Sequence, residues 1–105
     1  MSGLDNTSQT YRSTSVTPQT MTATDFHLHI VATSATVVNL PDSESIQPGR
    51  PYIVTKDAGA FTVTITPFDG ADTINGAATL VLASGAFHGA ILINTGDAWI
   101  AQAIY

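Results

Sequence analysis

The feature that most constrains this fold is a strict alternation of apolar and polar residues, which begins at Asp25 and recurs along the chain. The most regular case is 61–66, Phe-Thr-Val-Thr-Ile-Thr, where Phe61, Val63 and Ile65 share one face and threonines the other. Successive side chains of a β-strand point to opposite faces, so this period of two predicts strands that bury one face. Because no later segment shows the period of about 3.6 residues typical of an amphipathic helix, the chain is predicted to be all-β.

Glycine, proline and asparagine divide the alternating part into about eight short strands. The expected strands cover residues 25–30, 35–40, 52–55, 61–66, 72–74, 78–82, 90–93 and 98–105. Pro41, Pro48-Gly49 and Asn75-Gly76 fall between them, and Asn-Gly favours a tight turn because both residues tolerate positive φ. The pattern predicts a single antiparallel β-sandwich, jelly-roll-like, or a related β-barrel.

Residues 1–24 differ in composition from the rest of the chain. Serine, threonine, asparagine and glutamine dominate, and Leu4, Tyr11, Val16 and Met21 are isolated apolar positions. So few apolar residues cannot offset the entropy of ordering this segment alone, which favours a loose tail. The alternative is an extended arm that pairs with the sheet edge of a partner. We therefore expect an N-terminal arm over residues 1–24 and a β-sandwich domain over residues 25–105.

Charge is scarce and acidic. Three bases, Arg12, Arg50 and Lys56, stand against eight carboxylates, for a formal net charge of −5. Binding to nucleic acid or to an anionic membrane requires several lysines or arginines, so neither partner is expected. Charged residues make up 10% of the chain, so a surface of threonine, serine and small residues is expected, which suits subunit contacts.

Neither a signal peptide nor an apolar run of about 20 residues is visible, so we expect a soluble, unsecreted chain. The chain contains no cysteine, which fits folding in a reducing cytoplasm.

The last expected strand is apolar on both faces. One face carries Trp99, Ala101, Ala103 and Tyr105, and the other carries Ile100, Gln102 and Ile104. In a single β-sandwich, one side of each sheet is normally exposed to solvent. This strand is therefore expected either to lie centrally in the fold or to be covered by another subunit, which favours an oligomer.

Candidate chemistry is sparse. His27 and His29 share one strand face, but a metal would need a third ligand, such as His88 or Asp25, to converge from elsewhere. The alternatives are two polar positions on a half-buried strand, or a subunit interface where the histidines respond to pH. The segment 69–76 lacks the ligand spacing of a calcium loop. Since no nucleophile motif or phosphate loop occurs, we expect no enzyme activity, no metal and no cofactor.

The stretch from Val37 to Tyr105 resembles bacteriophage virion proteins. Its marks are Val-Asn-Leu-Pro ending at residue 41, the segments 49–57, 59–67 and 69–76, and Thr-Gly-Asp-Ala-Trp ending at Trp99. Similar strings occur in head decoration proteins, head fibres and tail fibres. The short chain looks most like a capsid decoration (cement) protein, a class that commonly forms trimers and grips the shell with an N-terminal arm.

This resemblance implies a structural protein on the capsid surface of the virion, synthesised in the cytoplasm of the host bacterium. The expected partners are the major capsid protein and two further copies of the chain, which together form a homotrimer. Expected contacts to the capsid are Leu4, Tyr11 and Arg12, and expected subunit contacts are His27, His29, Trp99, Ile100 and Tyr105. The alternative is a receptor- or carbohydrate-binding module of a tail or head fibre, for which Trp99, Tyr52 and Phe87 are the candidate aromatic residues.

Overall fold

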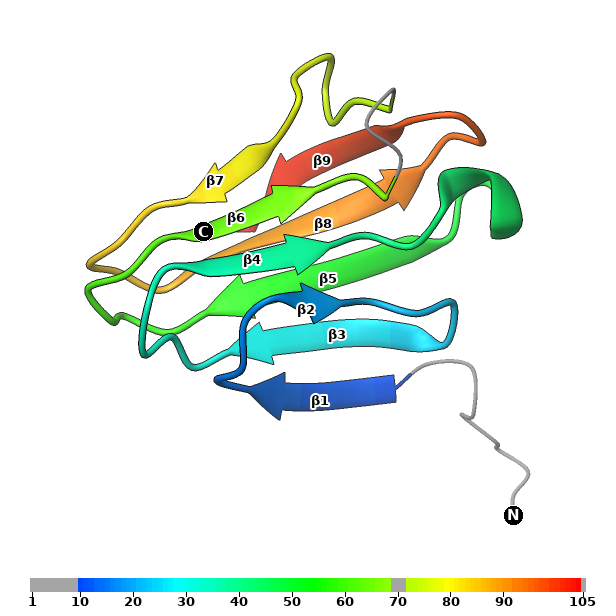
Figure 1. Ribbon diagram of the computed structural model, residues 1–105. Helices are drawn as coiled ribbons and strands as arrows, with labels where there is room; N and C mark the ends of the chain where they lie inside the picture. Colours follow the sequence, from blue (N-terminus) through cyan, green and yellow to red (C-terminus); the bar gives the residue numbers. More distant parts are fainter. Residues whose placement is uncertain (1–9, 69–71, 105) are drawn as a thin grey trace.

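The computed structural model describes residues 10–68 and 72–104, which form two β-sheets packed face to face (Figure 1). The five-stranded sheet has the order β1 (Thr10–Thr14), β3 (Asp25–Ile30), β5 (Pro51–Lys56), β8 (His88–Asn94) and β9 (Trp99–Ala103). The four-stranded sheet has the order β2 (Gln19–Thr20), β4 (Thr36–Asn39), β6 (Val63–Thr66) and β7 (Leu80–Leu82). A short 3-10 helix, η1 (Ser43–Ser45), lies between β4 and β5. The predicted all-β sandwich is confirmed, and the described strands do not close into a barrel.

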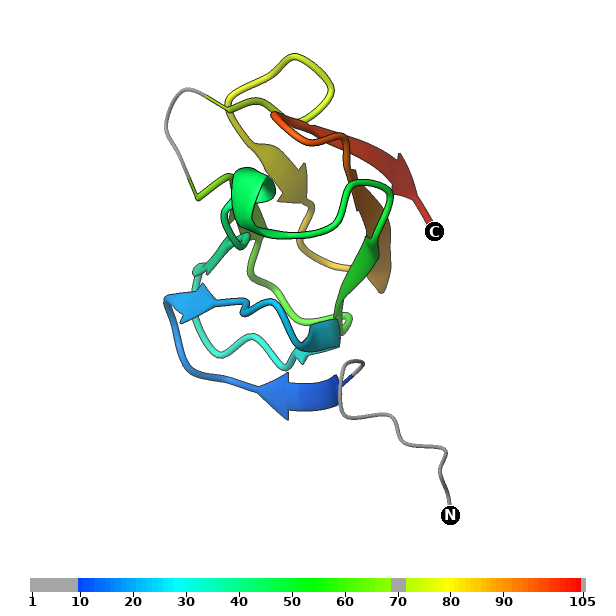
Figure 2. The same cartoon turned by 90° about the vertical axis from the view of Figure 1, so that its right-hand side faces the viewer.

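The strand directions differ from the sequence prediction. The first six strands alternate between the two sheets, and their neighbours in each sheet run parallel: β1, β3 and β5 in one, β2, β4 and β6 in the other. Figure 2, which views the molecule along the strands, shows the chain crossing between the layers. Antiparallel pairs involve β7, β8 and β9. The expected antiparallel, jelly-roll-like arrangement was therefore wrong for the first half, because a strand that crosses to the other sheet before returning comes back parallel to its predecessor.

The core lies between the two sheets and is built by the inward residues of the alternating segments. Its fully buried members include Leu28, Val38, Val54, Ile65 and Leu92. Val63 and Ile65 point inward as expected, but Phe61 precedes β6 and is 40% exposed. Phe26 is half-buried and lies outside the core cluster, because a bulge at the start of β3 interrupts its alternation.

The folded body begins before the boundary expected at residue 24. Strand β1 pairs with β3 in the five-stranded sheet, and β2 pairs with β4 in the four-stranded sheet. The segment 10–20 therefore contributes one strand to each sheet. Met21 follows them and is buried in the core. The low apolar content of this segment did not predict its order, because backbone hydrogen bonds to β3 and β4 and a set of polar side-chain contacts hold it in place. We name these side-chain contacts, made by Arg12 and Asp25, the clamp. Leu4 lies outside the described residues.

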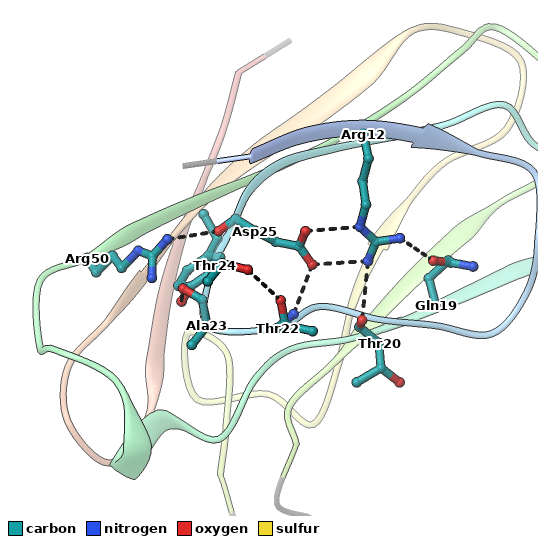
Figure 3. Close-up of polar contacts among 9 residues, drawn as sticks. Arg12, Gln19, Thr20, Thr22, Ala23, Thr24, Asp25 and Arg50 are labelled. Atoms are coloured by element: carbon teal, nitrogen blue, oxygen red, sulfur yellow. Dashed lines mark hydrogen bonds and ion pairs between the residues drawn. The ribbon is translucent and has the colours of Figure 1, made fainter. Parts of the chain in front are cut away.

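The clamp joins β1 to the start of β3 (Figure 3). The Arg12 guanidinium donates two hydrogen bonds of 3.0 Å to the Asp25 carboxylate and one of 2.6 Å to Gln19 Oε1. The backbone N–H of Thr22 donates to Asp25 Oδ2 at 2.9 Å. Burial raises the pKa of Asp25, but the bonds from Arg12 and Thr22 outweigh it and hold the pKa below its usual value. Arg12 thus binds its own chain.

The Asp25→Asn variant is expected to lose about 2–3 kcal/mol of unfolding free energy near pH 7, because asparagine is uncharged and replaces one of the two acceptor oxygens that face Arg12 with an NH₂ donor. Since the folded-state pKa of Asp25 is depressed, the ion pair stabilises the protein above the unfolded pKa, and this contribution is lost as pH falls through the folded value. Urea unfolding near pH 7 and near pH 3 should therefore show a difference between wild type and variant that shrinks in acid. An undiminished difference near pH 3 would contradict this account, and Asp97→Asn, an exposed position, is the control.

The free edge of β9 is covered by its own chain. Asn75, with a φ of 53°, and Gly76, with a φ of 81°, form the predicted tight turn between Ile74 and Ala77. The Asn75 side chain accepts from the backbone N–H of Ala101 and donates to its carbonyl, both at 2.9 Å. Strand β9 is therefore an edge strand whose polar backbone is partly satisfied from within, and the central position considered for it is wrong.

Candidate functional site

The candidate site is the face of the five-stranded sheet that points away from the core, here named the outer face. The strand register shows which residues belong to this face. Leu28, Val54 and Ala90 are paired across three neighbouring strands and point into the core, so the residues that alternate with them along each strand point outward. Their exposed fractions reach 59% for Tyr11 and 54% for Ile100. The outward residues are Tyr11, Ser13, His27, His29, Pro51, Ile53, Thr55, Gly89, Ile91, Ile93, Ile100 and Gln102.

This face lacks formal charge, although the chain has a net charge of −5. None of its outward strand residues is Asp, Glu, Lys or Arg. Ile53 pairs with Ile91, and Ile93 pairs with Ile100, which places four isoleucines in adjacent rows. An apolar, uncharged surface is easily desolvated, and depletion of charge is typical of the core of protein–protein interfaces.

Two histidines and a threonine form the polar centre of the outer face. The Thr55 hydroxyl lies 2.8 Å from His27 Nε2 and 2.7 Å from His29 Nδ1. Since a hydroxyl carries one proton, it donates to one imidazole and accepts from the other when both rings are neutral. The Tyr11 ring packs edge-on against His27, with 5.0 Å between the ring centroids.

Gly89 leaves the space that this polar unit needs. It pairs with Thr55 across β5 and β8, and a Cβ at this position would lie 2.8 Å from Thr55 Cγ2. Any larger residue would push Thr55 away from the two imidazoles. The histidine–threonine unit is therefore held by close packing as well as by hydrogen bonds.

Protonation of this unit should weaken the fold in mild acid. Burial and the neighbouring His29 lower the pKa of His27, so the unfolded chain binds a proton more readily than the folded one. Stability should therefore fall as pH drops through about 6.5 and level off below the folded pKa. Urea midpoints measured across this range should fall for wild type and less for His27→Gln. His88→Gln, outside the outer face, is the control; a variant that keeps the full wild-type pH dependence would rule out His27 as its source.

The structure gathers four of the predicted contact residues on one surface. Tyr11, His27, His29 and Ile100 all lie on the outer face. Trp99 instead points inward and is 1% exposed, and Arg12 is bound in the clamp with Asp25. Leu4 and Tyr105 lie outside the described residues.

Sequence reasoning missed Ile53, Ile91 and Ile93. Their strands contain the continuous apolar runs Tyr-Ile-Val and Ala-Ile-Leu-Ile, in which both faces are apolar. Such runs indicate a strand covered on both sides. The same argument that singled out the last strand therefore applied to β5 and β8.

The aromatic residues considered for carbohydrate binding do not form a surface. Tyr52 is fully buried, and its ring meets that of Trp99 edge-on, with 5.7 Å between centroids. Both therefore belong to the core, and neither can stack on a sugar. Phe87 remains accessible, with 57% of its surface exposed.

Across residues 10–68 and 72–104, no group of three or more histidine, cysteine, aspartate or glutamate side chains gathers as a metal site. The same part of the chain contains no pocket. Within it, no helix reaches the length and hydropathy required to span a bilayer. No family model, curated protein or solved structure matches this chain.

Proposed function

We propose that this protein is a bacteriophage capsid decoration protein, which binds the assembled head as a homotrimer and stabilises it. The observation that carries the proposal is the uncharged, isoleucine-rich outer face of the five-stranded sheet. The resemblance of residues 37–105 to phage virion proteins supports the same role. The major capsid protein is the expected partner, and the protein acts without catalysis.

The physical basis is linkage between binding and assembly. A protein that bridges neighbouring capsid subunits binds the assembled shell and not the separate subunits, so it shifts the equilibrium toward the shell. Such a bridge needs a rigid body and surfaces that fit other proteins. The outer face supplies one of these surfaces, and packing it against sister copies would remove its isoleucines from water.

The role in the virion is tested by the copy number of the protein in purified particles, measured by quantitative mass spectrometry against the major capsid protein. A copy number comparable with that of the capsid protein supports a decoration role. A few copies per particle would indicate a fibre or spike component instead. Absence from particles would overturn the proposal.

The subunit contact is tested by Ile100→Asp, which places a carboxylate on the outer face. Burying an unpaired charge between subunits is costly, so this variant should be monomeric by size-exclusion chromatography with light scattering. Ile100 is 54% exposed in the protomer, so its unfolding midpoint should change little. Val81→Asp is the matched control, because Val81 is 53% exposed on β7 of the other sheet. A trimeric Ile100→Asp variant would exclude the outer face as the subunit contact.

A further inference from the structure

Asn75 is the one asparagine of the chain that is followed by glycine. The other asparagines, Asn6, Asn39 and Asn94, are followed by threonine or leucine. An asparagine side chain can be attacked by the backbone nitrogen of the next residue, which is one reason why asparagine is chemically labile. Since glycine has no Cβ to shield that nitrogen, the pair Asn75-Gly76 has the composition of a spontaneous modification site.

The attacking nitrogen of this pair is accessible. Asn75 and Gly76 are both exposed, and a Cβ built on Gly76 would meet no atom within 4 Å. Within residues 10–68 and 72–104, no acceptor pairs with the Gly76 N–H. Neither packing nor a hydrogen bond therefore restrains the nitrogen, and water reaches it freely.

The Asn75 side chain, in contrast, is bound to β9 in the way that the peptide group of a neighbouring strand would be. The Ile104 N–H donates to the Gly89 carbonyl on the β8 side, so by alternation Ala101 directs its N–H and C=O to the free edge. The Asn75 amide supplies the partner for both groups, each at 2.9 Å. The Asn75 backbone N–H also donates to the Trp99 carbonyl at 3.0 Å. Asn75 thus closes two successive positions of the free edge, and we name its side-chain contact with Ala101 the cap.

We propose that Asn75 is a site of spontaneous deamidation, and that its conversion to isoaspartate opens the free edge of β9. The Gly76 nitrogen attacks Asn75 Cγ and forms a new N–Cγ bond, which closes a succinimide ring. The Cγ–Nδ2 bond breaks, and Nδ2 leaves as ammonia with the proton of the Gly76 N–H. Water then opens the ring by breaking one of its two C–N bonds, which gives aspartate or isoaspartate. The reaction needs only this chain and water, so it is independent of the proposed function.

The fold controls the rate of this reaction through the cap. Both polar atoms of the Asn75 amide are engaged with Ala101, so the side chain must release β9 before Cγ can turn to the Gly76 nitrogen. Conversion therefore proceeds through local opening of the turn. Two hydrogen bonds of ordinary net strength should slow such a step about 10- to 100-fold relative to the unfolded chain.

The product cannot keep the cap. Isoaspartate adds a methylene group to the main chain, which does not fit a tight turn closed by hydrogen bonds between Ile74 and Ala77. Its carboxylate has no N–H to donate to the Ala101 carbonyl, as Asn75 Nδ2 does. The N–H and C=O of Ala101 are then left open to solvent, and an open strand edge is a template for pairing with another chain.

The site is tested by incubating the full chain near pH 8, folded in buffer and unfolded in guanidinium chloride. Mass spectrometry of peptides with electron-transfer fragmentation locates the amide-to-acid mass shift and distinguishes isoaspartate from aspartate. In the folded protein the shift should occur at Asn75, about 10- to 100-fold more slowly than in the unfolded chain. Asn94 is the internal control and should stay intact there, because it is buried and donates to the carbonyls of Ile46 and Gln47. Equal rates in the two states would overturn protection by the cap, and no conversion of the folded protein after about 100 half-lives of the unfolded chain would overturn the site.

The opening of β9 is tested by hydrogen exchange at the Ala101 amide. Asn75→Gly removes the cap but keeps a residue that tolerates positive φ, so Ala101 should exchange about 10-fold faster. Ala78→Gly is the matched control, because it adds a glycine to the same exposed connection and leaves the cap in place. Aged protein that contains isoaspartate at residue 75 should exchange as fast as Asn75→Gly. A wild-type exchange rate at Ala101 in either the aged protein or Asn75→Gly would overturn the assignment of the cap to Asn75.

Discussion

The Trp99→Ala variant is expected to lose about 3–5 kcal/mol of unfolding free energy, enough to unfold much of a marginally stable domain. Trp99 opens β9, is 1% exposed and packs edge-on against the buried ring of Tyr52. Removing the indole leaves a cavity at the point where β9 joins the core. Urea unfolding followed by circular dichroism measures the loss.

Trp99→Phe separates the ring from its N–H group. Within the described residues, the buried Trp99 Nε1 has no hydrogen-bond partner, so phenylalanine removes an unsatisfied donor together with some volume. Its cost should be smaller, about 1–2 kcal/mol. The contrary result would be a Trp99→Ala variant that keeps its unfolding midpoint and loses its oligomeric state. That would place Trp99 between subunits, as its position in the sequence first indicated.

The Lys56→Met variant should lose about 2–4 kcal/mol, because methionine retains the apolar stem but leaves the carbonyls of Asp57 and Ala86 without their donor. Unfolding in urea measures the total effect. Hydrogen exchange locates it, since the Gly85 amide donates to Gly59 and should exchange faster in the variant. Val81→Met, on an exposed strand position, controls for the added methionine.

An unchanged stability in Lys56→Met would mean that the buried ammonium contributes nothing to the fold. Faster exchange at Gly85 with little global loss would instead confine its role to holding segments 57–62 and 83–87 together. Both measurements use the isolated protein, so they are independent of any partner.

The sequence predicted which residues face the core better than it predicted how the strands are connected. Val63 and Ile65 point inward because alternation alone assigns a side chain to a face. Asn75-Gly76 forms its turn because positive φ is a local property. Strand direction depends on whether the chain turns back beside its predecessor or crosses to the other sheet, and residues near Thr14 or Ile30 carry no local signal for that choice.

The candidate site was predicted in part. His27 and His29 were paired correctly by their spacing, but their shared partner Thr55 lies on a different strand. Arg12 was assigned to the capsid because nothing in the sequence shows that Asp25 lies beside it. Partners that are distant in the sequence are brought together by the tertiary structure, so the spacing of residues along the chain does not predict them.

The alternation of the first six strands between the two sheets has a mechanical consequence. Residues 10–20 form the outermost turn of a spiral, with β1 at one edge of one sheet and β2 at one edge of the other. A force on the N-terminal side would peel this turn away without parting any other strand pair, and the next turn, β3 with β4, would then become the exposed edge. The molecule would thus lengthen in successive steps and release tension gradually.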